Sequence, residues 1–235
     1  MRELTTTTVA YGDGIFAIDQ QMVKAFLVVG DEKALLIDTG AMQTDIRSII
    51  AGITDKPVTV VLTHSDGDHT GNLQAFSEAF IHANDLESVK ARPEYKSVTL
   101  NEVNAGDVFD LGGRKLRTLF IPGHTPGSIA LLDEENKLIF PGDTVSCGPV
   151  YMFGEGRNIN DYLDTLNYLR GFRDAGAFSS VYCAHGECPL DPSIIDTQIE
   201  LTRGIMSGNI KGEDTPMRGN TVVRLAKLGN TGILY

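Results

Sequence analysis

The chain has 235 residues, 42% of them hydrophobic, which suits a substantial buried core, and we predict a single domain over residues 1–235. Its formal net charge of −11 and its scattered Lys and Arg residues argue against a nucleic-acid partner. With no apolar run long enough for a membrane span, no secretory signal pattern and an odd number of cysteines, we expect a cytoplasmic protein with no membrane association.

The first part of the chain is predicted to form short strands joined by turns. Apolar and β-branched runs predict strands over residues 14–19, 24–30 and 34–38. Isoleucines at helical spacing predict a helix over residues 44–51, and the apolar run VTVVL predicts a buried strand over residues 58–62. Hairpins and a strand-helix-strand unit occur together, so a mixed sheet is expected rather than a purely parallel one.

The rest of the chain continues this alternation of strands and helices. Apolar residues recur every three or four positions over residues 159–172 and 192–203, which predicts helices there. We therefore expect an α/β (α+β) fold in which helices cover two mixed sheets, with the C-terminal strands closing a sheet. The other predicted strands cover residues 80–82, 115–121, 129–132, 137–140, 181–183, 221–226 and 233–235.

The strongest local signal is the segment THSDGDHTG, which directly follows the strand predicted over residues 58–62. It places His64, Asp66, Asp68 and His69 within six residues, and imidazoles and carboxylates are common ligands of zinc, iron and manganese. A loop on a rigid scaffold is where such side chains can converge. The segment therefore predicts a metal site.

Three later turns repeat this pattern. His124 lies between two Pro-Gly pairs, Asp143 follows another Pro-Gly pair, and His185 follows an apolar strand. Any one of these residues is more often an ordinary turn or surface residue than a ligand. Four of the five histidines nevertheless fall in the pattern. If the strands lie side by side, their ends meet at one edge and form a single site.

This set of residues resembles the signature of the metallo-β-lactamase superfamily, which is a His-x-His-x-Asp-His loop, a later His, a bridging Asp and a final His. The resemblance extends from the ALLIDTG strand to the CAHGE segment. It implies an αββα sandwich of two mixed sheets flanked by helices, with a dinuclear metal centre at one edge between the sheets.

The resemblance also assigns roles to individual residues. The matching positions imply a first metal site, a second metal site, and Asp143 as the ligand that bridges them. Asp38 in ALLIDTG matches a position that supports the site from behind the ligands, although it is equally a strand-ending turn residue. The implied ligands are His64, Asp66 and His124 for the first site and Asp68, His69 and His185 for the second.

Asp66 departs from the signature, which usually has histidine there. Flavodiiron-type members of the superfamily also use a carboxylate at this position. Counted formally, the charge of Asp66 together with those of Asp68, Asp143 and a hydroxide neutralises two divalent cations. We therefore expect two divalent metal ions, with iron or manganese competing well against zinc. An alternative is that Asp66 weakens the first site, so that a single metal is retained.

The expected activity is hydrolysis by a metal-bound hydroxide, which two cations stabilise near neutral pH. Asp68 is the candidate catalytic residue, because it can orient the nucleophile or accept its proton. Tyr151 and Phe153 lie in a segment after Asp143 that could form a wall of the pocket, or could simply pack on the core. Cys147 is the weakest candidate, since nothing in the sequence indicates a reactive thiol.

The substrate class follows by elimination. The sequence lacks the export signal of a secreted β-lactamase and the basic surface of RNA-processing members, and the 50 residues after His185 are too few for the C-terminal domain of glyoxalase II-like members. A small ester, thioester or lactone is left as the expected substrate. Two alternatives stay open: a di-iron redox protein that acts on oxygen, nitric oxide or sulfur compounds with a separate electron donor, and a non-catalytic metal-binding module. The sequence does not predict the oligomeric state.

Overall fold

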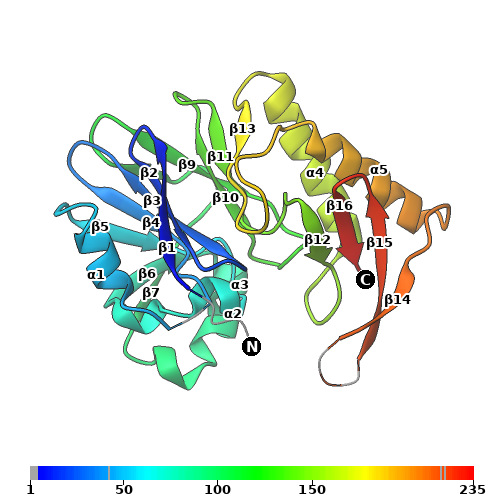
Figure 1. Cartoon of the computed structure of the whole chain (residues 1–235), viewed down its shortest axis with the longest axis horizontal. Coiled ribbons are helices and arrows are strands. Elements are labelled where there is room, and N and C mark those ends of the chain that lie inside the picture. The colour runs from blue at the N-terminus through cyan, green and yellow to red at the C-terminus, as the bar shows by residue number, and fades with distance from the viewer. Residues whose placement is uncertain (1–4, 42, 218, 220) are drawn as a thin grey trace.

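Two β-sheets lie face to face at the centre of the computed structural model, which describes residues 5–41, 43–217, 219 and 221–235 (Figure 1). The first sheet has seven strands in the order β1-β2-β3-β4-β5-β6-β7. The first five strands follow the sequence prediction closely, apart from β1, which is exposed and was not predicted. The bounds are β1 (Thr7–Gly12), β2 (Ile15–Asp19), β3 (Lys24–Val29), β4 (Ala34–Ile37), β5 (Val58–Val61), β6 (Glu78–Ile81) and β7 (Thr99–Glu102).

The second central sheet has five strands in the order β13-β11-β10-β9-β8. Its strand β10 is fully buried because helices cover one face and the first sheet covers the other. Ile129 and Leu131 pack toward the first sheet, whereas Ala130 and Leu132 pack toward the helices. The bounds are β8 (Val108–Asp110), β9 (Lys115–Phe120), β10 (Ile129–Asp133), β11 (Leu138–Phe140) and β13 (Ser180–Val181).

Helices cover the outer faces of both sheets, which confirms the αββα prediction (Figure 1). Helices α1 (Ile46–Ala51) and α3 (Ala83–Lys90) pack on the first sheet, and α4 (Ile159–Asp174) and α5 (Ile194–Met206) pack on the second. A short helix, α2 (Gly67–Thr70), lies just after β5. Of the helices in the described part of the chain, none is long and apolar enough to cross a membrane. The single-domain organisation stays a prediction.

A third sheet at the C-terminal side differs from the sequence prediction. The two C-terminal strands close neither central sheet; they form a separate four-stranded sheet in the order β12-β16-β15-β14. The segment around residue 150 was not predicted as a strand, but it forms one because β16 provides a parallel partner for its backbone. The bounds are β12 (Gly148–Tyr151), β14 (Glu213–Pro216), β15 (Val222–Leu228) and β16 (Thr231–Leu234).

Candidate metal centre

The predicted ligands follow strands from both central sheets. His64 follows β5 in the first sheet. His124 follows β9, Asp143 follows β11 and His185 follows β13, all in the second sheet. Strands β9 and β11 are both antiparallel to β10, and β13 is parallel to β11, so these three strands end at the same edge. The four strands thus do not lie side by side in one sheet; their ends meet at the shared edge of two facing sheets.

Asp68, His69 and His185, here called the second donor group, come together with Asp143. Asp143 Oδ1 is 3.0 Å from His69 Nε2 and 3.1 Å from His185 Nε2. Asp68 Oδ2 is 3.3 Å from His185 Nε2 and 3.8 Å from His69 Nε2. The potential ligand atoms of these four residues lie within 4.8 Å of one another, so one cation can contact all of them.

His64, Asp66 and His124, here called the first donor group, lie beside the second. The Nε2 atoms of His64 and His124 are 3.3 Å apart. Asp66 Oδ2 is 3.3 Å from His124 Nε2 and 3.7 Å from His64 Nε2. Burial would raise the pKa of Asp66, but hydrogen bonds from His124 and His64 outweigh it and hold this pKa below its ordinary value. All three side chains therefore point toward one position.

Asp143 connects the two donor groups. Its Oδ1 faces His69 and His185, while its Oδ2 is 3.7 Å from His124 Nε2. Ligand atoms about 2 Å from a tetrahedral cation lie about 3.3 Å from each other, which matches these spacings. Asp143 Oδ1 and His69 Nε2 are buried without a hydrogen-bond partner among the described residues, although only 3.0 Å separates them. Such atoms fit a divalent cation placed between them.

The Nδ1 atom of each histidine is held by the protein. His69 Nδ1 donates to Asp38 Oδ2 (2.7 Å) and His124 Nδ1 donates to the backbone carbonyl of Tyr151 (2.9 Å). His185 Nδ1 donates to the carbonyl of Met22. With one proton on Nδ1, an imidazole in its neutral form would present the lone pair of Nε2 to the centre, as a metal ligand must. The fourth histidine, His64, is held in the same way by the hydroxyl of Thr63.

Asp38 lies behind two of the candidate ligands, His69 and His64. Its carboxylate accepts hydrogen bonds from the backbone N–H and the hydroxyl of Thr63 and from His69 Nδ1. Its backbone has φ 63°, a conformation that few residues other than glycine adopt. Backbone strain of this kind persists where the surroundings over-determine it. Asp38 thereby connects a ligand of the second donor group to Thr63, which holds a ligand of the first.

Glycines before two of the ligands allow close packing at the site. Gly123 has φ +133°, and a Cβ there would lie 2.5 Å from the backbone of Tyr162. Gly142 has φ +55°, and a Cβ there would lie 2.6 Å from the hydroxyl of Thr63. The Pro-Gly pairs thus do more than mark turns: Gly123 lets the turn before His124 pack closely on helix α4, and Gly142 lets the turn before Asp143 pack closely on Thr63, which follows β5 of the first sheet.

The charged groups of the second donor group compensate one another. Burial would lower the pKa of His185, but Asp143 and Asp68 outweigh it and raise this pKa to about 10. The pKa of His69 is also raised, because Asp143 and Asp38 outweigh burial. Burial would raise the pKa of Asp143, but His69 and His185 hold it well below its ordinary value. A cation that binds here must therefore displace protons.

Arg157 is a functional residue that the sequence analysis missed. Its Nη2 donates to both carboxylate oxygens of Asp66, at 2.7 Å and 2.5 Å. The charge count made from the sequence omitted this guanidinium, so the prediction of a neutral centre loses its basis. No local signal indicates the pair, because 91 residues separate its members.

Asp85 is a second residue that the sequence analysis missed. It is buried, and its carboxylate accepts hydrogen bonds from the backbone N–H groups of Ser65 and Gly127 and from the hydroxyl of Thr125. It thereby ties the loop that carries the first donor group's His64 to the loop that carries its His124.

A cavity of about 480 Å³ opens onto both donor groups. Tyr151 lines it, and so does Met22, which was not singled out from the sequence. Phe153 packs against the Tyr151 ring with centroids 5.6 Å apart, but it is not one of the lining residues. Cys147 also lines the cavity, and burial raises the pKa of its thiol, which disfavours the reactive thiolate. The lining residues are Met22, Asp66, Asp68, Asp143, Cys147, Pro149, Tyr151 and His185.

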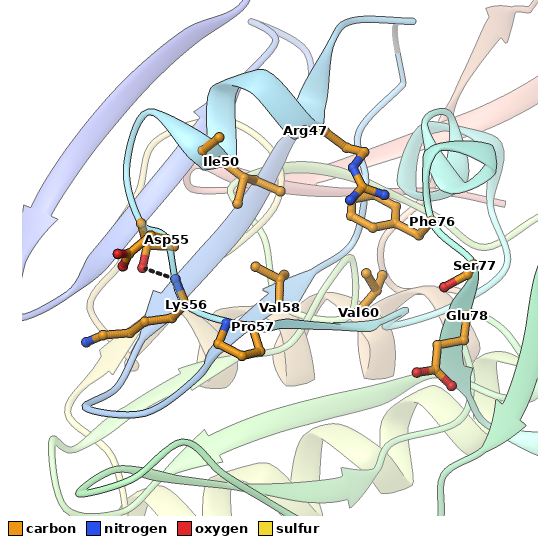
Figure 2. A pocket seen from close by; sticks show the side chains of 12 residues that line it. Arg47, Ile50, Asp55, Lys56, Pro57, Val58, Val60, Phe76, Ser77 and Glu78 are labelled. Carbon is orange, nitrogen blue, oxygen red and sulfur yellow. Dashed lines mark hydrogen bonds between the residues drawn. The ribbon is translucent and has the colours of Figure 1, made fainter.

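A different cavity, of about 390 Å³, lies at the amino end of β5, opposite the end that leads to His64 (Figure 2). Its floor is apolar, from Val58, Val60 and Phe76, and Arg47 lies over the Phe76 ring. The described residues that line it form no cluster of metal ligands. The clustered histidines and aspartates lie at the other end of the strand. His82, the remaining histidine, stacks on Phe120 outside both donor groups.

An αββα sandwich that gathers histidines and aspartates at the edge between its sheets defines a class of metal-dependent hydrolases. The chain belongs to the metallo-beta-lactamase superfamily, whose family model matches residues 18–178. This match includes every predicted ligand except His185.

Relatives in this family carry names of hydrolases. The chain is 27% identical over 219 residues to the human acyl-coenzyme A thioesterase MBLAC2, covering 74% of this chain and 78% of the relative. It is 30% identical over 185 residues to a hydroxyacylglutathione hydrolase from Synechococcus, covering 74% of this chain and 67% of the relative. The chain is thus an enzyme of a hydrolase family.

Solved structures confirm the fold. A metallo-beta-lactamase from Pontibacter korlensis has a TM-score of 0.70 at 19% identity, and the match covers 85% of this chain and 99% of that one. The sec-alkylsulfatase Pisa1 from Pseudomonas has a TM-score of 0.70 at 13% identity, covering 86% of this chain and 42% of that one. At these identities the likeness concerns the fold alone.

Proposed function

We propose that the chain hydrolyses a small acyl thioester at a centre of two divalent cations. The proposed ligands belong to the two donor groups and share Asp143, with Asp38 supporting them from behind. The donor set of imidazoles and carboxylates suits zinc, iron or manganese. The proposed ligands are His64, Asp66, His124, Asp68, His69, His185 and Asp143.

The observation that carries this proposal is the position of the cavity. Asp68 and His185 lie in the same wall as the apolar side chains of Met22, Pro149 and Tyr151. An acyl chain can therefore be buried while its carbonyl carbon reaches the donor groups. The names of two relatives, an acyl-coenzyme A thioesterase and a hydroxyacylglutathione hydrolase, support the same substrate class.

The chemistry of the leaving group favours a thioester over an ordinary ester. Each carboxylate and histidine that lines the cavity belongs to the proposed ligand set, so none is left as a separate general acid. A thiol has a pKa of about 8.5, so it leaves as a thiolate far more readily than an alcohol leaves as an alkoxide. A thioester therefore needs no proton donor for this step.

Different residues of the chain would have different roles in hydrolysis. A divalent cation held by the donor groups lowers the pKa of water and polarises a carbonyl oxygen. Asp68, which is partly exposed to the cavity, would orient the attacking water and accept its proton on the carboxylate. Tyr151 and Met22 bury the acyl chain, and Phe153 supports the Tyr151 ring from behind.

A substrate panel tests this function. The purified protein is first analysed for its metals and then assayed with thioesters, oxygen esters, lactones and a β-lactam, each with the metal found. We expect thioesters to be cleaved fastest, and Asp68→Asn to reduce their turnover by about a hundredfold to ten-thousandfold. Preference for another substrate of the panel would contradict the substrate class. Undiminished hydrolysis by the Asp68 variant would contradict the site.

The cellular compartment and the type of binding partner are also part of this proposal. The three cysteines are free thiols, which suits a reducing compartment such as the cytoplasm. The net charge of −11 suits a small-molecule substrate better than a nucleic acid.

A further inference from the structure

The carboxylate of Asp66 has two competing partners. On one side, its Oδ2 is 3.3 Å from His124 Nε2 and points into the first donor group. On the other side, Arg157 Nη2 donates to both of its oxygens, at 2.5 Å and 2.7 Å. Each carboxylate oxygen has two lone pairs, so Asp66 can accept from Arg157 and still bind a cation through Oδ2. A cation there and the guanidinium then share one carboxylate.

The position of Arg157 is fixed by its surroundings. Its neighbour Asn158 caps helix α4 with its side chain, and the backbone N–H of Asn158 donates to the carbonyl of Gly123 (2.9 Å). Gly123 in turn precedes His124, so the arginine and this ligand share one backbone connection. Arg157 Nε is buried and has no hydrogen-bond partner among the described residues, which leaves Asp66 as the group that holds the guanidinium.

The charges around the centre follow from this contact. A family member with histidine at position 66 has a neutral ligand there. Asp66 adds one negative charge, and Arg157 adds one positive charge within hydrogen-bond distance. Asp68 differs, because no Lys or Arg of the described chain forms an ion pair with it. The two donor groups therefore offer a cation unequal electrostatic attraction.

We propose that Arg157 is a positioning residue that neutralises Asp66, so that the first donor group attracts a divalent cation more weakly and the second donor group loads first. The guanidinium holds the carboxylate toward His64 and His124 while cancelling its charge. The Asp66–Arg157 pair thus acts as the equivalent of the neutral histidine that the family signature has there. This inference concerns cation binding and is independent of the substrate proposed above.

Titration of the metal-free protein with Zn²⁺ against a chromophoric chelator tests the inference. We expect a tight and a weaker binding event. His185→Ala should remove the tight event and His124→Ala the weaker one. Arg157→Met, which removes the charge but keeps an apolar stem, should strengthen the weaker event by about tenfold or more, because a cation no longer faces a nearby positive charge. The zinc affinity of Arg157→Lys should stay near that of the wild type, because lysine keeps the positive charge.

A double-mutant cycle separates this role from a purely structural one. Asp66→His alone leaves the guanidinium facing the cations without a partner, so it should weaken the first donor group. Asp66→His combined with Arg157→Met should restore zinc affinity, because a histidine then stands there without a neighbouring charge. Arg117→Met is the matched control, since it breaks another arginine–carboxylate pair, with Glu134 at 2.6 Å, away from the site.

Each outcome decides the question. The proposal is supported if Arg157→Met tightens the weaker zinc-binding event, or binds a second zinc where the wild type binds one. Recovery of zinc affinity in the double variant also supports it. Unchanged or weakened zinc binding in Arg157→Met overturns the proposal. It is also overturned if the two substitutions lower the zinc affinity additively in the double variant. Thermal unfolding of each metal-free variant shows whether it is folded, and Arg157→Gln replaces any Met variant that is not.

Discussion

The two donor groups share Asp143 and the same way of holding histidines, but they differ in their carboxylates. In both groups, Nδ1 of each histidine donates to the protein and leaves Nε2 for a ligand. Asp68, in the second donor group, meets only histidines among its ion-pair partners in the described chain. Asp66, in the first donor group, also meets Arg157. The fold thus fixes the geometry of both positions equally, while a single arginine distinguishes their charge.

This comparison separates what the fold supplies from what single side chains supply. Strand ends, Pro-Gly turns and the short helix α2 place the candidate ligands, so the scaffold itself provides two adjacent positions. Electrostatic asymmetry then comes from one residue in the loop before α4. Variants should therefore fall into two kinds: those that damage both positions, and those that damage one.

The largest effect is expected for Asp143→Asn, which replaces the carboxylate that both donor groups share. Both oxygens of Asp143 face donor-group histidines, so we expect both cations to be lost and turnover to fall at least about a thousandfold. Metal content after desalting and the hydrolysis rate measure the two losses. Asp55→Asn, at an exposed position, is the control. Retention of one stoichiometric cation would show that the positions are independent.

A smaller loss of zinc affinity, confined mainly to one donor group, is expected when a hydrogen-bond partner of a candidate ligand is removed. Asp38→Asn weakens the hold on His69 and should lower zinc affinity of the second donor group by about tenfold to a hundredfold. Thr63→Val removes the hydroxyl that holds His64 and should act mainly on the first. Comparing the two binding events in both variants checks this assignment. Equal losses at both events in each variant would argue against separate supports.

The candidate ligands could be named from the sequence because their signals are local. Each one follows an apolar strand and stands in a turn, and the order of the motifs resembles one family. Continuous apolar runs, as in β3 and β10, also indicated most of the central strands. The αββα arrangement came from the family resemblance and is confirmed by the similar solved structures.

The residues that were missed act over long distances in the chain. Arg157 is 91 residues from Asp66, and Met22 is 163 residues from His185, whose Nδ1 its carbonyl holds. Neither contact leaves a local pattern, because only the folded backbone brings the partners together. Strands such as β1 and β14 were missed for a related reason: they are largely exposed and lack the alternation of a half-buried strand.

A moderate effect is expected at the cavity wall. Tyr151→Ala removes an apolar surface but keeps the backbone carbonyl that holds His124, so the donor groups should keep their cations. We expect kcat/KM for a long-chain thioester to fall about tenfold, and that for a short-chain thioester to change little. Phe153→Ala should have a smaller effect on kcat/KM, since Phe153 does not line the cavity but packs against the ring of Tyr151, which does. Tyr168→Ala, an exposed position on α4, is the control. Equal losses for short and long chains would rule out an acyl-binding role.

The smallest effect concerns the protons that the second donor group carries before a cation binds. The pKa of His185 is about 10 in the metal-free fold, above the value of about 6.5 for an unfolded chain. Its protonation therefore stabilises the metal-free fold fully below about pH 6.5, and this contribution is lost as the pH rises through about 10. At pH 7.5 a cation must displace this proton, and that of His69 as well.

Calorimetry in two buffers measures this release directly. Zinc binding at pH 7.5 should release about one to two protons, so its enthalpy should differ between buffers that have different ionisation heats. His185→Asn should reduce the number released by about one, and its metal-free form should lose less stability between pH 6.5 and 10 than the wild type. Identical enthalpies in both buffers would mean that the second donor group is already deprotonated.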